Sequence, residues 1–177
     1  IYAGTGSTSF GDLHNGNGTL YFVGNDGVNG SELWKSDGTD AGTIMIKDIE
    51  TGTGGSNIRR FATLNSNTYF FANTAATGNG LWKTDGTDAG TVIVKDLNDN
   101  ESPDYLTLVG NTLFFRGYDD TNGAELWKSD GTGAGTILVK DIFPGISDGY
   151  PVNLFNANGT LYFSASNEAK SPGDYIE

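Results

Sequence analysis

Short apolar runs separated by Gly, Asn and Asp recur along the whole 177-residue chain. The runs are rich in β-branched and aromatic residues, and the residues between them are typical turn formers, which is the signature of β-strands. No stretch has the 3.6-residue periodicity of an amphipathic helix. The hydrophobic pattern therefore predicts an all-β protein.

Four kinds of apolar segment follow one another in a fixed order, and the order repeats. The first kind lies at residues 10–13, 61–64, 105–108 and 151–154. The second lies at 20–22, 69–71, 113–115 and 161–163. The third is a Leu-Trp-Lys segment at 33–35, 81–83 and 126–128, and the fourth lies at 43–49, 91–97 and 136–142. The leucines of the third kind are 48 and 45 residues apart, so the sequence contains an internal repeat.

The residues between these segments predict antiparallel hairpins. Gly110-Asn111 and Ser66-Asn67 suit two-residue turns between the first and second segments. In the loop 36–43 the Asp carboxylate can accept bonds from the following backbone N–H groups, while Gly38 takes a positive φ. We therefore interpret the repeated motif first as structural. Its residues are Leu33, Trp34, Asp37, Gly38, Thr39, Leu81, Trp82, Asp85, Gly86, Thr87, Leu126, Trp127, Asp130, Gly131 and Thr132.

Adjacent apolar residues within the predicted strands indicate sheets that are covered on both faces. A sheet with one wet face would instead alternate apolar and polar residues. Small sheets covered on both faces stack on one another, as in a β-propeller of four-stranded antiparallel blades. A straight β-solenoid is the rival fold, but its repeats are typically shorter.

The repeat divides the chain, taken as a single repeat domain over residues 1–177, into four units. Blade 1 with its lead-in covers 1–49, blade 2 covers 50–97, blade 3 covers 98–142 and a partial blade 4 covers 143–177. Residues 1–7 align with the exit from a fourth strand, and the tail 173–177 is a candidate degenerate third strand. The open edge of the fourth blade is expected to be paired or covered by another chain or copy.

Composition narrows the classes of function. The chain has 10 basic and 22 acidic residues and a net charge of −12, which disfavours nucleic acid as a partner. It has no Cys, which excludes disulfides, thiolate nucleophiles and Cys-ligated metals. It also lacks an apolar run of 18 residues, so no membrane span is predicted.

The stretch Glu-Leu-Trp-Lys-Ser-Asp-Gly-Thr at residues 125–132, with its Ala-Gly-Thr and Val-Lys-Asp-Ile flanks, resembles the ELWxxDGT repeat family. The resemblance extends to about residue 165, and the motif occurs three times. It implies a secreted or surface-anchored bacterial protein with a β-propeller fold, and it implies no defined reaction. Gly80 replaces the acidic residue of the motif, and the fourth unit lacks the motif.

Two groups of residues are candidate binding sites. Trp34, Trp82 and Trp127 could form a sugar-stacking ring, although large aromatics flanked by apolar strands usually pack in a core. Oxygen-rich loops between the second and third segments could hold Ca²⁺, with turn formation as the alternative use. The Ca²⁺ candidates are Asp26, Asn29, Glu32, Asp119, Asp120, Asn122 and Glu125.

The one histidine, His14, is expected at a turn and exposed, and no Ser-His-Asp or zinc constellation surrounds it in the sequence. No catalytic residue and no cofactor are predicted. The sequence favours a non-enzymatic extracellular or cell-surface module for structure or adhesion, which assembles with itself as a homo-oligomer or filament, or with neighbouring segments. A carbohydrate-binding propeller with a glycan partner is the alternative, and a polysaccharide-degrading enzyme is the third interpretation.

Overall fold

The computed structural model describes residues 11–97 and 101–167 and contains fourteen strands in these ranges. Sheet 1 consists of β1 (Gly11–Gly16), β2 (Thr19–Asn25), β3 (Ser31–Ser36) and β4 (Ile44–Lys47). Sheet 2 consists of β5 (Arg59–Leu64), β6 (Asn67–Thr74), β7 (Gly78–Thr84) and β8 (Val92–Asp96). Sheet 3 consists of β9 (Asp104–Val109), β10 (Thr112–Asp119), β11 (Gly123–Ser129) and β12 (Ile137–Lys140). Sheet 4 consists of β13 (Val152–Ala157) and β14 (Thr160–Ser164).

Each sheet is an antiparallel meander in which the strands pair in sequence order. The prediction of an all-β chain built from repeated four-stranded antiparallel units is thereby confirmed for sheets 1 to 3. Sheet 4 contains only the first two strands of the pattern within the described residues. The assignments made for residues 1–7 and 173–177 lie outside the described residues.

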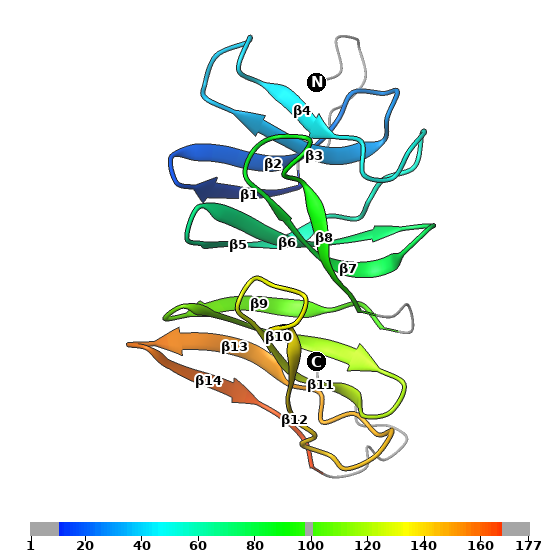
Figure 1. The fold of residues 1–177 in the computed structure, drawn as a ribbon, viewed down its shortest axis with the longest axis vertical. Coiled ribbons are helices and arrows are strands. Elements are labelled where there is room, and N and C mark those ends of the chain that lie inside the picture. Colours follow the sequence, from blue (N-terminus) through cyan, green and yellow to red (C-terminus); the bar gives the residue numbers. More distant parts are fainter. Residues whose placement is uncertain (1–10, 98–100, 168–177) are drawn as a thin grey trace.

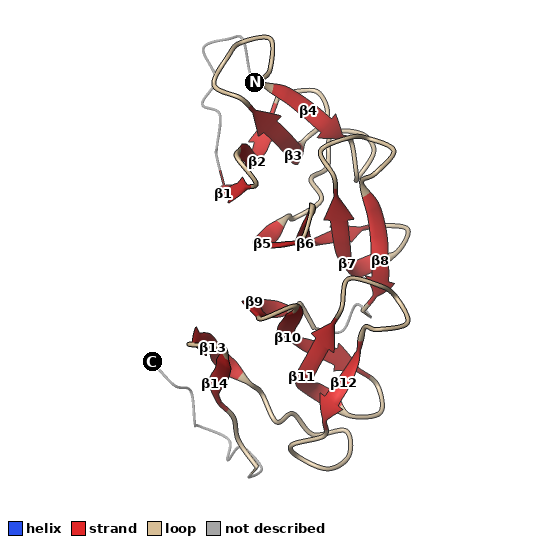
Figure 2. Cartoon of the chain, turned by 60° about the vertical axis from the view of Figure 1, so that its left-hand side comes forward, coloured by secondary structure: helices blue, strands red, loops and turns tan. Residues whose placement is uncertain are grey.

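The four sheets stack on one another along the longest axis of the molecule (Figure 1). The first strands β1, β5, β9 and β13 contact one another from sheet to sheet. Figure 2 shows that these first strands follow one side of the stack, whereas β4, β8 and β12 follow the opposite side. The stack is curved, with the first strands on its inner side.

Two hydrophobic clusters fill the spaces between sheets, and we call these spaces joints. The joint between sheets 1 and 2 contains Leu33 of β3 and Trp82 of β7. The joint between sheets 2 and 3 contains Leu81 of β7 and Trp127 of β11. Because successive side chains of a strand point to opposite faces, the neighbours Leu81 and Trp82 fill different joints. Sheet 2 is therefore covered on both faces, as its adjacent apolar residues predict.

A β-bulge recurs at one position in all four first strands. The register shifts between Gly11 and His14 in β1 and at the matching places in β5, β9 and β13. Each bulge contains a non-glycine residue with a positive φ: Asp12, Arg60, Tyr105 and Asn153, at 22°, 57°, 60° and 56°. Bulges bend a strand and increase its twist, so the inner strands of all four sheets bend alike.

The hairpin turns correct one register prediction. Gly110-Asn111 forms the turn between β9 and β10, as predicted, because Val109 pairs with Thr112. The predicted turn Ser66-Asn67 is wrong, since Leu64 pairs with Asn67 and the turn residues are 65 and 66. Asn65 supplies the positive φ of 56° that this turn requires, which Asn tolerates. Residues 68–70 therefore match residues 20–22, and a slip of one residue would place every side chain on the wrong face.

Candidate functional site

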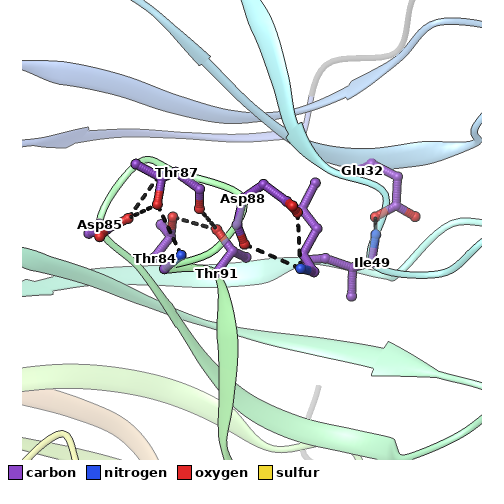
Figure 3. Close-up of polar contacts among 9 residues, drawn as sticks. Glu32, Ile49, Thr84, Asp85, Thr87, Asp88 and Thr91 are labelled. Carbon is purple, nitrogen blue, oxygen red and sulfur yellow. Dashed lines mark hydrogen bonds and ion pairs between the residues drawn. The ribbon is translucent and has the colours of Figure 1, made fainter.

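The repeated Asp-Gly-Thr loop builds its own turn, shown for the second repeat in Figure 3. The Asp85 carboxylate accepts bonds from Thr87 N and Thr87 Oγ1 at 2.9 and 2.7 Å. The Thr87 hydroxyl accepts a bond from Gly90 N at 2.9 Å. The hydrogen bond from the Thr87 side chain lowers the pKa of Asp85 below its ordinary value, and the bond from the Thr87 backbone N–H adds a smaller contribution in the same direction. The first and third repeats form the same bonds at Asp37, Thr39, Asp130 and Thr132.

The Asp-Gly-Thr loop also covers the preceding sheet. The backbone of Gly86 lies over the phenol of Tyr21, and Lys35 Nζ donates to Gly86 O at 2.7 Å. Lys47 Nζ forms an ion pair with Asp88 Oδ1 at 3.0 Å (Figure 3). Exposed ion pairs contribute little to stability, so apolar and backbone contacts dominate this joint.

The second joint repeats the contact between loop and tyrosine. The backbone of Gly131 lies against the phenol oxygen of Tyr69. Burial, with a smaller contribution from the charge of Asp130, raises the pKa of Tyr69. Burial and the charge of Asp85 do the same for Tyr21 in the first joint. The loop between the third and fourth strands of one sheet thus also covers a tyrosine of the previous sheet.

All three tryptophans are buried, with 6%, 8% and 9% of Trp34, Trp82 and Trp127 exposed. Trp34 lies 6.4 Å from the Phe22 ring across β2 and β3, and Trp127 lies 6.5 Å from Phe115 in the equivalent place. The three indole nitrogens have no hydrogen-bond partner within the described ranges. These side chains are therefore held by apolar packing, and their rings are not available as platforms for stacking on a sugar.

The acidic residue of the motif clamps the connection between two sheets. Glu32 is fully buried, and its carboxylate accepts a bond from Ile49 N at 2.9 Å (Figure 3). It also accepts bonds from Ser56 N and Ser56 Oγ at 3.0 and 2.7 Å. Glu125 is equally buried and accepts bonds from Ile142 N, Phe143 N and Gly149 N at 3.0, 3.2 and 2.6 Å. Each glutamate therefore ties the third strand of its sheet to the segment that enters the next sheet.

Burial raises the pKa of Glu32 to about 7, and the bonds from Ser56, Ile49 and Glu50 oppose this rise. Burial likewise raises the pKa of Glu125. Sequence reasoning missed this role, since it assigned both residues to candidate Ca²⁺ loops. The available signal was their position, directly before the buried Leu-Trp pair in two of the three motifs.

The second repeat, with Gly80 in place of the glutamate, holds its connection differently. Asn79 O accepts a bond from Leu97 N at 2.9 Å, and Asn79 Nδ2 donates to Glu101 O at 3.4 Å. Arg59 donates to Asn79 Oδ1 at 3.2 Å. A neutral amide one residue earlier thus takes over part of the clamp.

The remaining Ca²⁺ candidates bond the backbone of their own loops. Asp26 Oδ1 accepts bonds from Val28 N and Asn29 N at 2.9 and 2.8 Å. Asp119 Oδ1 accepts bonds from Thr121 N and Asn122 N at 2.8 and 2.7 Å. Asp120 is the next residue and is exposed at the tip of the loop between β10 and β11. In the described ranges no group of three or more His, Asp or Glu residues is arranged to hold a metal ion. This geometry is that of turn formation, and Ca²⁺ binding stays a prediction.

An open cavity of about 320 Å³ lies on the inner side of the stack, and His14 is part of its wall. The expectation that His14 is exposed at a turn is wrong: it lies in β1, is half-buried, and contacts Thr63 Oγ1 at 2.7 Å. Its ring stacks on Phe61 at 5.7 Å, and burial lowers the pKa of His14. The cavity is lined by Asp12, Leu13, His14, Arg60, Phe61 and Leu106.

The charged groups of this cavity are paired with one another. Arg60 Nε forms an ion pair with Asp104 Oδ1 at 2.5 Å, and Arg60 N donates to Asp12 Oδ2 at 2.9 Å. The guanidinium of Arg60 also lies over the Tyr105 ring, 5.8 Å from its centre. These contacts join the inner strands of sheets 1, 2 and 3, so the cavity wall is part of the structural framework.

Neither a protein-family model nor a curated protein matches the sequence. Among the described residues, no helix is long and apolar enough to cross a membrane. The fold and the contacts described above define an all-β repeat protein, in which residues of the repeated motif join one sheet to the next. The function is proposed below from these contacts.

Two glycines at the same place in their loops separate backbone strain from sheet joining. Gly38 and Gly131 have φ values of 90° and 92°, but a Cβ at Gly38 would meet nothing within 4 Å, whereas one at Gly131 would collide with Tyr69. We expect Gly38→Ala to lower the free energy of unfolding by about 1–2 kcal/mol through backbone strain. Gly131→Ala should lose roughly 1–3 kcal/mol more through overpacking, as measured by denaturant titration. Equal losses would show that the loop does not press on the preceding sheet.

The clamp predicts a pH dependence of stability. Because the folded pKa of Glu32, about 7, exceeds its ordinary value of 4.5, the folded chain binds this proton more tightly than the unfolded chain. The resulting stabilisation is complete below the ordinary pKa and is lost as the pH rises toward 7. The free energy of unfolding of the wild type, minus that of Glu32→Gln, should therefore fall between pH 4.5 and 7. A difference that stays constant or grows over this range would contradict the raised pKa.

Proposed function

We propose that the chain is a segment of a β-propeller of the ELWxxDGT type, acting as a non-enzymatic structural or adhesion module outside the cell or on its surface. One observation carries the proposal: at both joints, residues of the repeated motif hold one sheet to the next. Trp82 and Trp127 fill the joints, and the second and third Asp-Gly-Thr loops cover the preceding sheet. Glu32 and Glu125 clamp the connections.

The propeller architecture is supported by the curvature of the stack. In a propeller the first strand of each blade lies nearest the central axis, and successive blades repeat one rotation. Here the first strands contact one another on the inner side of the curve, and they share one bulge. A repeated joint with a constant bend produces an arc, which further sheets of the same kind would extend. We therefore propose that the module assembles with like segments, either neighbouring ones or those of another copy.

The extracellular location and the role in adhesion come from the resemblance to the repeat family and from the surface charge. A net charge of −12 keeps such a chain soluble and disfavours polyanionic partners. The non-enzymatic character is supported by the inner cavity, where Arg60 is paired with Asp104 instead of facing an open site.

The two other interpretations differ from this proposal in a measurable way. We expect no release of reducing ends from a panel of polysaccharides and no binding on a glycan array by the purified chain. The buried tryptophans offer no stacking face, and stacking on aromatic rings is the usual way in which proteins hold sugars. Glycan binding that disappears in Trp34→Ala while the circular dichroism spectrum is unchanged would favour the carbohydrate-binding propeller. Turnover of a polysaccharide would favour the enzyme.

A further inference from the structure

Sheet 4 exposes aromatic residues that the other sheets bury. Tyr162 is 59% exposed, whereas the tyrosines at the same register position in sheets 1 and 2, Tyr21 and Tyr69, are 6% and 4% exposed. Phe163 is 39% exposed. Its equivalents Phe22, Phe70 and Phe115 are 3%, 0% and 0% exposed. The difference lies in what covers these positions, since the residue types are the same.

The exposure of Phe163 indicates that a third strand would fit beside β14. In the complete sheets the equivalent phenylalanine is paired across the ladder with the tryptophan of the Leu-Trp-Lys strand: Phe22 with Trp34, and Phe115 with Trp127. β14 is the edge of sheet 4 in the described residues, so no tryptophan stands opposite Phe163. An edge strand leaves backbone N–H and C=O groups ready to pair with a further strand.

Sheet 3 also has an exposed residue at a position that further strands of sheet 4 would cover. Val139 of β12 is 42% exposed, whereas Ile46, at the same position of β4, is 7% exposed. The residue at this position of β8, Val94, packs against the joint between sheets 2 and 3, and its carbonyl lies beside Gly133 in the third-repeat loop. Val139 is therefore exposed where the Asp-Gly-Thr loop of a following four-stranded sheet would lie.

We propose that sheet 4 is a docking site for a two-stranded hairpin of the type Glu-Leu-Trp-Lys…Asp-Gly-Thr…Lys-Asp, the third and fourth strands of a further repeat. The hairpin adds to β14 by β-augmentation, with its tryptophan opposite Phe163 and its loop over Val139. This inference rests on the proposed function in that it takes sheet stacking as the mode of assembly. It adds to that function the segment that binds and the pairing of its residues with β14.

A second copy that stacks its first sheet on sheet 4 is a different occupant. Such a copy would lie on the free face of sheet 4 and cover Tyr162 and Phe155, which is 63% exposed. It would leave the edge of β14 unpaired and would not reach Phe163, which faces sheet 3, or Val139. The pattern of exposure therefore favours the hairpin over the stacked copy.

Binding of a synthetic peptide tests the proposal. The probe is a labelled peptide with the sequence of residues 123–142, which holds a complete hairpin, and the readout is fluorescence anisotropy with the full chain. The control peptide carries Asp in place of the tryptophan. We expect saturable binding of the first peptide, weakened at least about tenfold by Phe163→Lys in the protein or by the Asp in the peptide. Val28→Lys changes an exposed residue of the β2–β3 loop, 67% exposed, and should leave binding unchanged.

A disulfide reports the register. Leu126 pairs with Arg116 in sheet 3, and Ser164 is the residue of β14 at the position of Arg116. Ser164→Cys should therefore cross-link to a peptide with Cys in place of Leu126, and not to a peptide with Cys in place of Trp127, whose side chain points to the other face. The chain has no cysteine of its own that would interfere.

Each outcome has a defined meaning. Register-specific cross-linking, together with binding that Phe163→Lys abolishes and Val28→Lys does not, supports the docking site. Absence of binding, binding that Phe163→Lys leaves intact while its tryptophan emission matches the wild type, or cross-linking in the other register overturns it. None of these failures bears on the glycan and turnover assays, so the proposed function can stand while the docking site falls.

Discussion

The structure depends on burying both faces of small antiparallel sheets. A four-stranded sheet of this size has too little apolar surface to be stable alone, and it gains stability only by stacking on a neighbour. The Leu-Trp pair of the third strand meets this need directly, because Leu81 and Trp82 point to opposite faces and fill two different joints. Every sheet of the stack thus stabilises the sheets on either side of it.

The polar residues of the motif also join the sheets, at two places. Asp85 and Thr87 fix a turn whose backbone lies close over Tyr21 of the previous sheet. Glu32 uses its buried carboxylate to hold the connection to the next sheet, which satisfies backbone N–H groups that would otherwise be buried without partners. Loop, clamp and core therefore act on one joint, which explains why they recur together in one short motif.

The sequence alone was sufficient to predict the all-β class and the repeated four-stranded units, because strand periodicity and turn residues are local signals. Prediction from the sequence failed for features that depend on contacts between distant residues or on a register shift of one residue. The turn at Asn65-Ser66 was misplaced because Ser66-Asn67 is nearly as suitable a pair by composition. The clamp by Glu32 was missed because its partners lie 17 to 24 residues further along the chain. His14 was misplaced because β1 continues past Leu13 to Gly16, so that His14 pairs with Tyr21 instead of lying in the turn.

The central claim is that the indole rings are buried by apolar packing, those of Trp82 and Trp127 between stacked sheets, and quenching of their fluorescence tests it most directly. The three tryptophans are the whole of the chain's indole content, so acrylamide quenching of the folded protein reports on them alone. The account predicts blue-shifted emission and quenching several-fold weaker than in the chain unfolded by denaturant, since 6–9% of each side chain is exposed. Emission typical of hydrated indole, with quenching equal in the folded and unfolded chains, would contradict it.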